Sequence, residues 1–401
     1  MKVLQINSVC GYGSTGKIAV DLYQMLEKQG NECCIAYGRG TAPEAVKTMK
    51  IGNQADFYIH ALKTRIFDCH GFASRAVTER FIAQAKKYDP DVIHLHNIHG
   101  YYINVELLFK YLKEIKKPVI WTLHDCWSFT GHCAHFDSIG CEKWKKQCHH
   151  CPLKKDYPQS LLRDSSFRNY EKKKNIFSGV EKMTIVTPSR WLAKKVKESF
   201  LKEYPVEVIP NGIHTEVFHP IEKNQSIQVK KALSDKYSID FSKKVFLGVA
   251  SIWTKDKGIY DFIKMSEIIP EDTQLVMAGV SAKQKEELPT GMIGIERTEN
   301  QQELALLYAC ADAFLNPTYA DTFPTVNLEA RSCGIPVISY DTGGSSESAD
   351  IVVSKGDYKG MLKKALSSEK SANLPDKICA EDIDRNHCLN KYLHIYDNVK
   401  Q

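Results

Sequence analysis

The sequence contains no run of about 18 consecutive apolar residues, so no membrane-spanning helix is predicted. Its first residues, MKVLQINSVCGYG, lack the charged start, long apolar stretch and small-residue cleavage site of a signal peptide. No repeat of about 20 to 50 residues and no low-complexity segment is visible. These absences predict a cytoplasmic protein made of ordinary globular domains.

The composition and net charge are those of ordinary globular proteins. The 401 residues are 43% hydrophobic and 25% charged, with a formal net charge of +6, which is typical of globular domains. Basic residues are not interleaved with aromatic base-reading motifs, so nucleic acid is not a predicted partner. Lysines gather in EKWKKQ, EKKKN and WLAKKVKESFLK. They predict either solvated helix faces or a basic surface for anionic lipid or a phosphorylated substrate.

Short apolar strands alternate with helical stretches along the chain, which is typical of α/β proteins with parallel sheets. The predicted strands are residues 2–9, 31–38, 92–97, 118–125, 183–189, 206–213, 244–251, 274–280, 292–298, 313–318 and 336–341. We therefore predict two doubly wound, Rossmann-like domains, residues 1–215 and 216–382, with ligands bound in the cleft between them. Residues 383–401 are predicted to form a helix able to pack back on the N-terminal domain.

Gly11, Gly13 and Gly16 form GYGSTG, which matches the G-x-G-x-x-G loop of dinucleotide-binding domains directly after the first predicted strand. That fingerprint also needs an acidic residue at the end of the second strand, and NECCIAYGRG ends without one. Arg39 in that segment leaves an NADP-dependent oxidoreductase open as an alternative. Otherwise the loop is a glycine turn that packs closely or approaches a different phosphate or sugar.

Residues 316–347, NPTYADTFPTVNLEARSCGIPVISYDTGGSSE, carry the most informative pattern. Asp321 follows a strand, a helix is predicted to begin near Thr325, and Glu329 lies in its first turns. A helix N-terminus attracts phosphate, and a carboxylate can accept hydrogen bonds from two ribose hydroxyls. By itself, however, Glu329 is also explained as a favourable acid in a first turn. The residues expected to bind phosphate at this helix start are Phe323, Pro324, Thr325 and Val326.

The same stretch resembles the signature of the retaining GT-B glycosyltransferases that use nucleotide sugars, the bacterial surface-polysaccharide or colanic-acid type called group 1. That pattern is an acid, seven residues, Glu, then a small residue followed by Cys-Gly-x-Pro-Val-Ile and a Gly-Gly-x-x-Glu turn. Here it reads Asp321, Glu329, residues 333–338 and residues 343–347. WTKDKGIYDFIK, VIPNGIHTEVFHP and VIWTLHDCW are similar to other family segments, so the resemblance covers nearly the whole chain.

The resemblance implies transfer of a sugar from a UDP-sugar or GDP-sugar, with retention at the anomeric carbon and no catalytic metal. The implied acceptor is a glycan or a polyprenyl-linked glycan of cell-surface polysaccharide synthesis, reached at the cytoplasmic face of the membrane. Lys257 would bind the donor diphosphate, Asp321 the donor sugar, Glu329 the ribose, and His124 the sugar near the reacting carbon. The glycine loop, through Gly13 and Gly16, is also expected to bind the donor.

Two positions depart from the family pattern. Ser251 stands where the family commonly has an arginine, so Thr254 or Lys255 is expected to compensate at the diphosphate. Asp321 replaces the commoner Glu, which shortens its reach toward the sugar. Separately, His94 and His96 occupy alternate positions of one strand and therefore point to one face, which is a candidate lining for the acceptor side.

Residues 131–152, GHCAHFDSIGCEKWKKQCHHCP, concentrate cysteine and histidine. Four cysteines on one loop in a reducing compartment predict a structural Zn²⁺ site, because four thiolates close the tetrahedron. The predicted ligands are Cys133, Cys141, Cys148 and Cys151. Reduced thiols and an iron–sulfur cluster are alternatives, and a neighbouring histidine (His132, His135, His149 or His150) could replace one cysteine. Trp144 and the lysines beside it (Lys143, Lys145 and Lys146) are expected to be exposed on this loop, beside His124, where they would suit a lipid-carried acceptor.

Three other functions compete with glycosyl transfer. The same scaffold could hydrolyse or epimerise nucleotide sugars, which would release free or altered sugar without transfer. A zinc-stabilised binding module without catalysis would be indifferent to loss of Lys257 or Glu329. An oxidoreductase would bind NADP.

Overall fold

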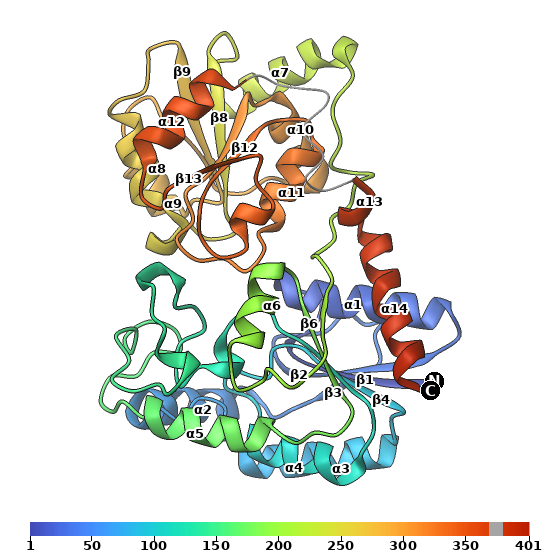
Figure 1. Cartoon of the computed structure of the whole chain (residues 1–401). Helices are drawn as coiled ribbons and strands as arrows, with labels where there is room; N and C mark the ends of the chain where they lie inside the picture. The colour runs from blue at the N-terminus through green and yellow to red at the C-terminus, as the bar shows by residue number, and fades with distance from the viewer. Residues whose placement is uncertain (369–379, 401) are drawn as a thin grey trace. The chain divides into compact units, whose positions relative to one another are not determined.

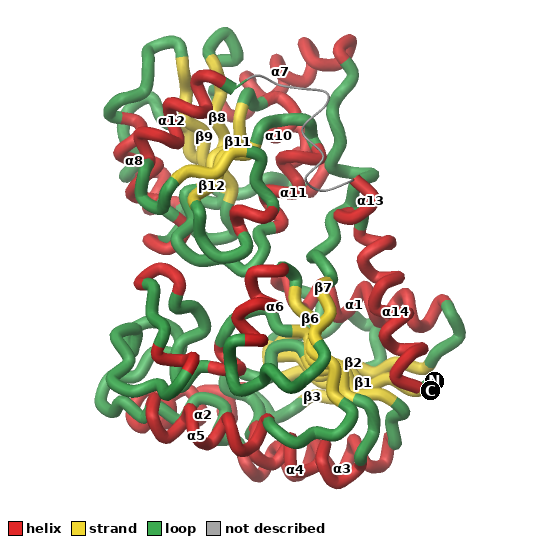
Figure 2. The backbone as a smooth tube through the Cα atoms, viewed as in Figure 1, coloured by secondary structure: helices red, strands yellow, loops and turns green. Residues whose placement is uncertain are grey.

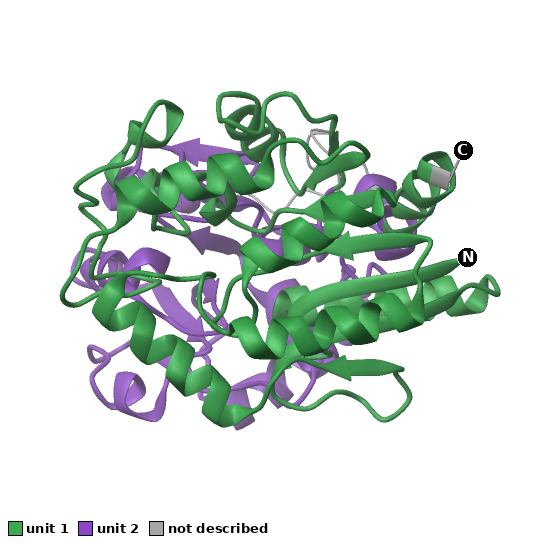
Figure 3. Ribbon diagram, turned by 90° about the horizontal axis from the view of Figure 1, so that it is seen from below, with its two compact units in different colours: residues 1–209, 389–401 green, residues 210–388 purple. Residues whose placement is uncertain are grey.

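A computed structural model of the protein describes residues 1–368 and 380–400. Contacts divide the chain into two compact units, residues 1–209 with 389–401 and residues 210–388 (Figure 3). Each unit is a parallel sheet with helices packed along it (Figure 1 and Figure 2). The predicted class, two doubly wound α/β domains, is therefore confirmed. No helix in the described ranges has both the length and the apolar composition that a bilayer span requires.

The first sheet has seven parallel strands in the order β3-β2-β1-β4-β5-β6-β7. These strands are β1 (Lys2–Val9), β2 (Glu32–Arg39), β3 (Thr48–Lys50), β4 (Val92–Leu95), β5 (Val119–Thr122), β6 (Met183–Thr187) and β7 (Val206–Val208). Every residue of β4 and β5 is buried. Strands covered by helices on both faces need continuous apolar sequence, which explains the VIWT of β5.

The helices of the first unit run between these strands. They are α1 (Gly13–Lys28), α2 (Gln54–Phe67), α3 (Arg75–Tyr88), α4 (Val105–Ile115), α5 (Ser166–Phe177) and α6 (Arg190–Lys197). In α4, Val105, Leu108 and Leu112 recur at helical spacing and are buried. The Asn104 side chain caps the start of α4 by accepting a hydrogen bond from the Leu107 amide.

Residues 123–165 connect β5 to α5 with only three short 3₁₀ turns, η1 (Trp127–Phe129), η2 (Asp137–Ile139) and η3 (Lys143–Lys145). A loop of this length needs a core of its own. The ring centroids of Phe136 and Trp144 lie 4.8 Å apart. The prediction that Trp144 is exposed is wrong, because its indole fills this aromatic cluster and is only 1% exposed. Its Nε1–H donates to the carbonyl of Cys141 at 2.9 Å.

The second sheet has six parallel strands in the order β10-β9-β8-β11-β12-β13. These strands are β8 (Lys244–Val249), β9 (Thr273–Ala278), β10 (Ile293–Ile295), β11 (Ala313–Asn316), β12 (Val337–Tyr340) and β13 (Ile351–Val353). The helices that follow β7 are α7 (Lys223–Tyr237), α8 (Ile259–Ser266), α9 (Ala282–Glu286), α10 (Gln301–Cys310), α11 (Thr325–Ser332), α12 (Tyr358–Ser367), α13 (Ala380–Ile383) and α14 (Arg385–Lys400). From Leu389 onward α14 belongs to the first unit.

The carboxyl ends of parallel strands share one edge of a sheet, where ligands bind in folds of this kind. In the first unit this edge carries the Gly11–Gly16 turn after β1 and His124 after β5. In the second unit it carries Lys257 after β8 and Asp321 after β11. The fold therefore places the predicted site residues at the carboxyl edges of the two sheets.

Candidate functional site

Lys257 and Asp321 form an ion pair at the carboxyl edge of the second sheet. Lys257 ends the 3₁₀ turn η4 (Lys255–Lys257), and its Nζ lies 2.6 Å from Oδ2 of Asp321. The next residue, Gly258, has a φ of +78°, and a Cβ there would lie 2.2 Å from the carbonyl oxygen of Pro317. Only glycine permits this approach. The Lys-Gly pair thus brings the ammonium to the loop that carries Asp321.

A glycine turn holds the other side of Asp321. Gly344 donates its amide to the carbonyl of Asp321 at 3.0 Å. A Cβ on Gly343 would lie 1.9 Å from that same oxygen, and the φ of Gly343 is +55°. The Oδ1 of Asp321 accepts the amide of Phe323 at 3.1 Å. The carboxylate is therefore fixed by Phe323 on one oxygen and by Lys257 on the other.

Helix α11 begins at Thr325, as predicted, and carries Glu329. Oε2 of Glu329 accepts the hydroxyl of Tyr308 from α10 at 3.2 Å. Burial raises the pKa of Tyr308 well above its usual value, so the phenol stays a donor. Pro324 has no amide hydrogen, and the amide of Phe323 is held by Asp321. Of the four residues predicted to donate to phosphate, Thr325 and Val326 are the two whose amides have no acceptor within the helix.

Buried hydrogen bonds anchor α11, and sequence reasoning did not find them. Asn327 is fully buried. Its Oδ1 accepts the side-chain amide of Asn316 at 2.7 Å, and its Nδ2 donates to the hydroxyl of Ser348 at 3.0 Å. These contacts link the helix to β11 and to the turn after β12. The signal available in the sequence was an asparagine two residues before Glu329.

His124 follows β5 in the first unit, where a chain of polar groups sets its proton position. Nε2 of His124 lies 3.3 Å from Nδ1 of His96, and Nε2 of His96 lies 3.0 Å from Oε1 of Gln5. The Gln5 amide is oriented by its Nε2, which donates to the carbonyl of Ala19 at 3.0 Å. An amide oxygen only accepts, so His96 carries its proton on Nε2.

The protonation of His124 follows from that of His96. Burial lowers the pKa of His96 well below its usual value and lowers that of His124 to about 4, so both rings are neutral near pH 7. A neutral imidazole has one donor and one acceptor nitrogen. Nδ1 of His96 therefore accepts the Nε2–H of His124, which leaves Nδ1 of His124 as its acceptor nitrogen.

The C-terminal helix supports this histidine pair. The rings of His94 and His96 stack with centroids 4.1 Å apart, so the prediction that they share one face is confirmed. Nδ1 of His94 lies 2.5 Å from the hydroxyl of Tyr396 in α14, and its Nε2 lies 2.8 Å from the hydroxyl of Thr122. Both histidines are buried behind the edge of the sheet. His94 supports His96, which in turn contacts His124. The expectation that one of the two histidines lines the acceptor side stays a prediction.

Asp125, which directly follows His124, is a polar group at this edge that the sequence reasoning passed over. Its Oδ2 lies 2.7 Å from Nε2 of His99, and its Oδ1 accepts the Trp127 amide at 2.9 Å. Burial alone would raise the pKa of Asp125, but attraction to His99 and these hydrogen bonds outweigh it and lower the pKa to about 2. The carboxylate is thus charged and held in place.

The glycine loop after β1 belongs to the first unit. Gly11 donates its amide to the carbonyl of Gly16 at 3.1 Å. A Cβ on Gly16 would lie 3.0 Å from a methyl of Val9, whereas nothing within 4 Å would meet one on Gly13. Gly16 therefore serves close packing. Binding of the donor by Gly13 and Gly16 stays a prediction.

The four cysteines of the loop line one small cavity of about 20 Å³, together with His132. All four are free thiols. Nδ1 of His132 lies 2.6 Å from the carboxylate of Asp68, and its buried Nε2 finds no hydrogen-bond partner among the described residues. Within residues 1–368 and 380–400, however, no three His, Cys, Asp or Glu side chains are arranged to hold one metal ion. The structure gathers the predicted ligands Cys133, Cys141, Cys148 and Cys151 without forming the coordination sphere, so the zinc site stays a prediction.

The lysines predicted to be exposed on this loop differ from one another. Lys146 is exposed, whereas Lys143 and Lys145 are half-buried. Nζ of Lys143 donates to the carbonyls of His149 and His150 at 3.1 and 3.2 Å. Nζ of Lys145 pairs with Glu142 at 2.6 Å and with Glu198 at 3.2 Å. Both half-buried lysines therefore make contacts that hold the loop in place.

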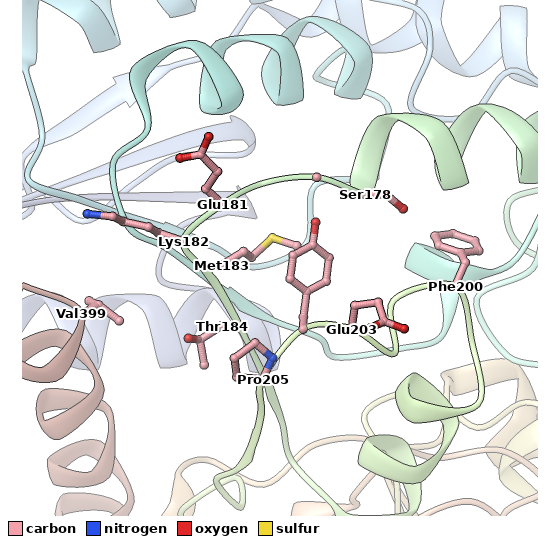
Figure 4. Close-up of a pocket in the computed structure, with 11 residues that line it drawn as sticks. Ser178, Glu181, Lys182, Met183, Thr184, Phe200, Glu203, Pro205 and Val399 are labelled. Atoms are coloured by element: carbon pink, nitrogen blue, oxygen red, sulfur yellow. The ribbon is translucent and has the colours of Figure 1, made fainter.

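A cavity of about 560 Å³ lies at the opposite edge of the first sheet (Figure 4). Lys182, Met183 and Thr184 line it at the start of β6, and Val399 of α14 closes one side. This is the amino edge of the sheet, away from His124. Because ligands in such folds bind at the carboxyl edge, this cavity is not the candidate site.

Two family models match the chain. Residues 15–217 match the model described as Glycosyltransferase Family 4, and residues 243–368 match the model described as Glycosyl transferases group 1. Over 175 residues the chain is 31% identical to a provisionally assigned colanic acid biosynthesis glycosyl transferase (WcaC) of Escherichia coli K12, covering 39% of this chain and 41% of that protein. Over 250 residues it is 25% identical to the alpha-galactosylglucosyldiacylglycerol synthase of Streptococcus pneumoniae, covering 56% and 62%. The matched segments thus span about half the length of these curated relatives.

Solved structures share the fold along the whole chain. A sucrose-phosphate synthase from Thermosynechococcus elongatus superposes with a TM-score of 0.69 at 15% identity, over 100% of this chain and 99% of that one. The HepE protein of Anabaena, solved in complex with UDP, gives a TM-score of 0.68 at 12% identity, over 99% and 100%. At these identities the likeness shows the fold alone, which is the predicted GT-B fold.

Proposed function

Because the chain belongs to the glycosyltransferases of Family 4 and group 1, we propose that it is a retaining glycosyltransferase. It moves a sugar from a nucleotide diphosphate sugar to a glycan or polyprenyl-linked acceptor in the synthesis of a cell-surface polysaccharide. The observation that carries this proposal is the Lys257–Asp321 pair, 2.6 Å apart at the carboxyl edge of the second sheet, next to the helix that bears Glu329.

Lys257 binds the donor diphosphate in this proposal. Negative charge grows on the leaving diphosphate as the glycosidic bond breaks, and a compact ammonium in a fixed position stabilises that charge. The turn at Gly258 supplies the fixed position. The amides of Thr325 and Val326, at the start of α11, offer further donors to the same phosphates. Ser251 and Lys255 are both exposed, so Lys255 is free to add the second positive charge that the family draws from an arginine.

Asp321 holds the sugar, and Glu329 holds the ribose. In the absence of donor, Asp321 compensates the charge of Lys257. When a diphosphate takes over the ammonium, the Oδ2 of Asp321 becomes available to sugar hydroxyls. Glu329 already accepts one hydroxyl, that of Tyr308, and a carboxylate has sites for several more.

Retention without an enzymic nucleophile requires the acceptor to attack from the side that the diphosphate leaves. The acceptor oxygen bonds to the anomeric carbon as the bond to the diphosphate oxygen breaks, and that phosphate oxygen takes the proton of the acceptor hydroxyl. His124 is the group of the first unit proposed to contact the donor sugar. Its ring is neutral near pH 7, and a neutral imidazole can accept a hydrogen bond from a sugar hydroxyl. No metal is needed for these steps.

UDP is the nucleotide we favour, because the HepE structures of the same fold contain UDP. A relative from Campylobacter jejuni, 26% identical over 216 residues, is an N-acetylgalactosaminyltransferase named for a diphospho-undecaprenol acceptor. This name supports a lipid-linked acceptor here. We also propose peripheral contact with the cytoplasmic membrane face, because Lys194 and Lys197 of α6 are exposed and basic residues attract anionic lipid.

A thermal-shift screen of UDP-, GDP- and ADP-sugars tests the proposal, since a ligand that binds only the native state raises the melting temperature. We expect one nucleotide class to stabilise the protein, and Lys257→Ala and Glu329→Ala to abolish the shift. Lys283→Ala, which removes an exposed lysine paired with Glu287, is the matched control. A protein that binds no nucleotide sugar would fit the non-catalytic binding module, and one stabilised by NADP alone would fit the oxidoreductase.

A further inference from the structure

Arg39 ends β2 and opens onto a cavity of about 470 Å³ at the carboxyl edge of the first sheet. The donor site proposed above does not use this cavity. It is lined from β2, from β3 and from the start of α2, by Gly38, Arg39, Gly40, Thr41, Lys50, Asn53, Gln54, Phe57 and Tyr58. None of these lining residues is acidic.

The guanidinium of Arg39 has no carboxylate partner among the described residues. The Cζ of Arg39 lies 5.6 Å from the ring centroid of Phe57. Its Nε is buried and finds no hydrogen-bond acceptor in the described parts of the chain. A buried donor without an acceptor costs free energy, which the cation–π contact with Phe57 offsets in part. The Nε is closed off from the cavity, so a ligand would have to bind the other nitrogens of the guanidinium.

Lys50 adds a second positive charge to the same cavity. Its ammonium lies 4.3 Å from the ring centroid of Tyr37 and donates to the carbonyl of Gly40. Asp56 lies close by in α2, but its carboxylate accepts the amide of Asn53 at 3.0 Å as part of the helix cap. The cavity is therefore positively charged, and its neighbouring acid is engaged in holding the helix.

Aromatic side chains complete the wall. The ring centroids of Phe57 and Tyr58 lie 5.4 Å apart, and those of Phe57 and Tyr101 lie 5.5 Å apart. Tyr58 is 60% exposed. Aromatic faces with polar tips suit ligands that have both apolar and hydroxylated surfaces, and sugar rings have both.

We propose that this cavity binds an oxyanion carried by a carbohydrate, held by the fork of Arg39 and the ammonium of Lys50. Phosphate, diphosphate and carboxylate share the required chemistry, because each accepts paired hydrogen bonds from a guanidinium. The oxyanion site is argued from the cavity alone. Only its assignment to the acceptor rests on the proposed function. The enzyme would then select an acidic acceptor, either a sugar diphosphate or a uronic acid.

Isothermal titration with sodium pyrophosphate and with sodium glucuronate, at constant ionic strength, tests the site. The protein is the full chain with Lys257→Ala, so that the donor lysine does not contribute. We expect at least one probe to bind, and Arg39→Gln to weaken its binding by about tenfold or more, because a charge-assisted hydrogen bond is lost. Arg75→Gln is the matched control, since it removes one exposed arginine charge of α3 and should leave binding unchanged.

The outcomes separate the sources of the oxyanion. Tighter pyrophosphate identifies a diphosphate acceptor, and tighter glucuronate identifies a uronic acid. Absence of binding by both probes, or equal binding by Arg39→Gln, would overturn the proposal. So would binding of NADP at Arg39 without either probe, which would favour the oxidoreductase. If Arg39→Gln does not fold, chemical modification of Arg39 by phenylglyoxal tests the site instead. The bound probe should protect Arg39 from modification, and sodium chloride at the same ionic strength should not. Failure here leaves the nucleotide-sugar screen unaffected, so the two proposals fail separately.

Discussion

The two halves of the Lys257–Asp321 pair should affect nucleotide binding in opposite directions. Lys257 attracts the diphosphate, whereas the carboxylate of Asp321 competes for the same ammonium at 2.6 Å. Asp321→Asn removes that competition and keeps an oxygen for the amide of Phe323. We therefore expect Asp321→Asn to tighten binding of the nucleoside diphosphate and Lys257→Ala to weaken it.

The exposure of the pair sets the magnitudes. The side chain of Lys257 is 36% exposed and that of Asp321 is 19% exposed, so the pair should contribute about 0.2–1 kcal/mol, as surface ion pairs do. Its removal tightens nucleoside diphosphate binding by about 1.5- to 5-fold. Loss of the Lys257 ammonium costs about 1.5–3 kcal/mol, which is roughly 10- to 150-fold in affinity. The free energy of unfolding should change by less than about 1 kcal/mol in either variant.

Titration calorimetry with UDP and with the UDP-sugar from the screen measures both effects. If Asp321 contacts the sugar, the extra affinity that the sugar adds over UDP should fall by about fivefold in Asp321→Asn, because a charged hydrogen bond becomes neutral. Lys283→Ala should match the wild type. Weakened UDP binding in both Lys257→Ala and Asp321→Asn would show that Asp321 does not compete with the diphosphate, because the pair would then act as one structural unit.

Three further predictions concern the first unit. Metal analysis should find about one zinc per chain. The zinc should be lost in Cys148→Ser and in Cys151→Ser, and it should be kept in the control Cys69→Ser, which changes a cysteine outside the loop. A metal-free wild-type protein would contradict the zinc site. Gln5→Leu should remove the acceptor that fixes the proton of His96, so ¹⁵N spectra of the histidine rings should show His124 as a mixture of tautomers. The control Cys33→Ala, which removes another partner of Gln5, should leave His124 in a single tautomer. An unchanged spectrum of Gln5→Leu would contradict the hydrogen-bond chain from Gln5 through His96 to His124. Finally, the free energy of unfolding should fall as the pH drops from about 6.5 toward 4. Burial lowers the pKa of His94 to about 3 and that of His124 to about 4. As the pH falls below about 6.5, these histidines therefore take up protons in the unfolded chain before they do so in the folded protein. The folded protein loses roughly 1.4 kcal/mol of stability per pH unit for each histidine. Urea titrations at pH 7, 5.5 and 4 measure this fall, and a shallower dependence is expected for His94→Gln.

Local sequence predicted the elements that long, continuous patterns define. The strand at residues 2–9 and the helix start at Thr325 lie where expected. The short strands β3 and β13 were missed, because three residues of TMK or IVV carry no period to recognise. Their pairing is decided by the neighbouring strands β2 and β12.

The candidate site was predictable where a motif carries it and not where distant residues meet. The acid–Glu spacing pointed to Asp321 and Glu329, but nothing local indicates that Asp321 is paired with Lys257, 64 residues away. The contact between His94 and Tyr396 joins residues 302 positions apart. Trp144 was expected to be exposed because lysines surround it in sequence, whereas tertiary packing buries it against Phe136. Such contacts depend on the whole fold.

Lys257 and Glu329 are proposed to serve sugar transfer from a nucleotide donor. The most direct test measures nucleoside diphosphate release from the UDP-sugar in the presence of a bacterial lipid-linked glycan extract, with glycosylated product followed in parallel. We expect wild-type transfer, and losses of about 10²-fold or more in Lys257→Ala and Glu329→Ala with the fold intact. Wild-type rates of transfer in both variants would show that neither Lys257 nor Glu329 belongs to the donor site.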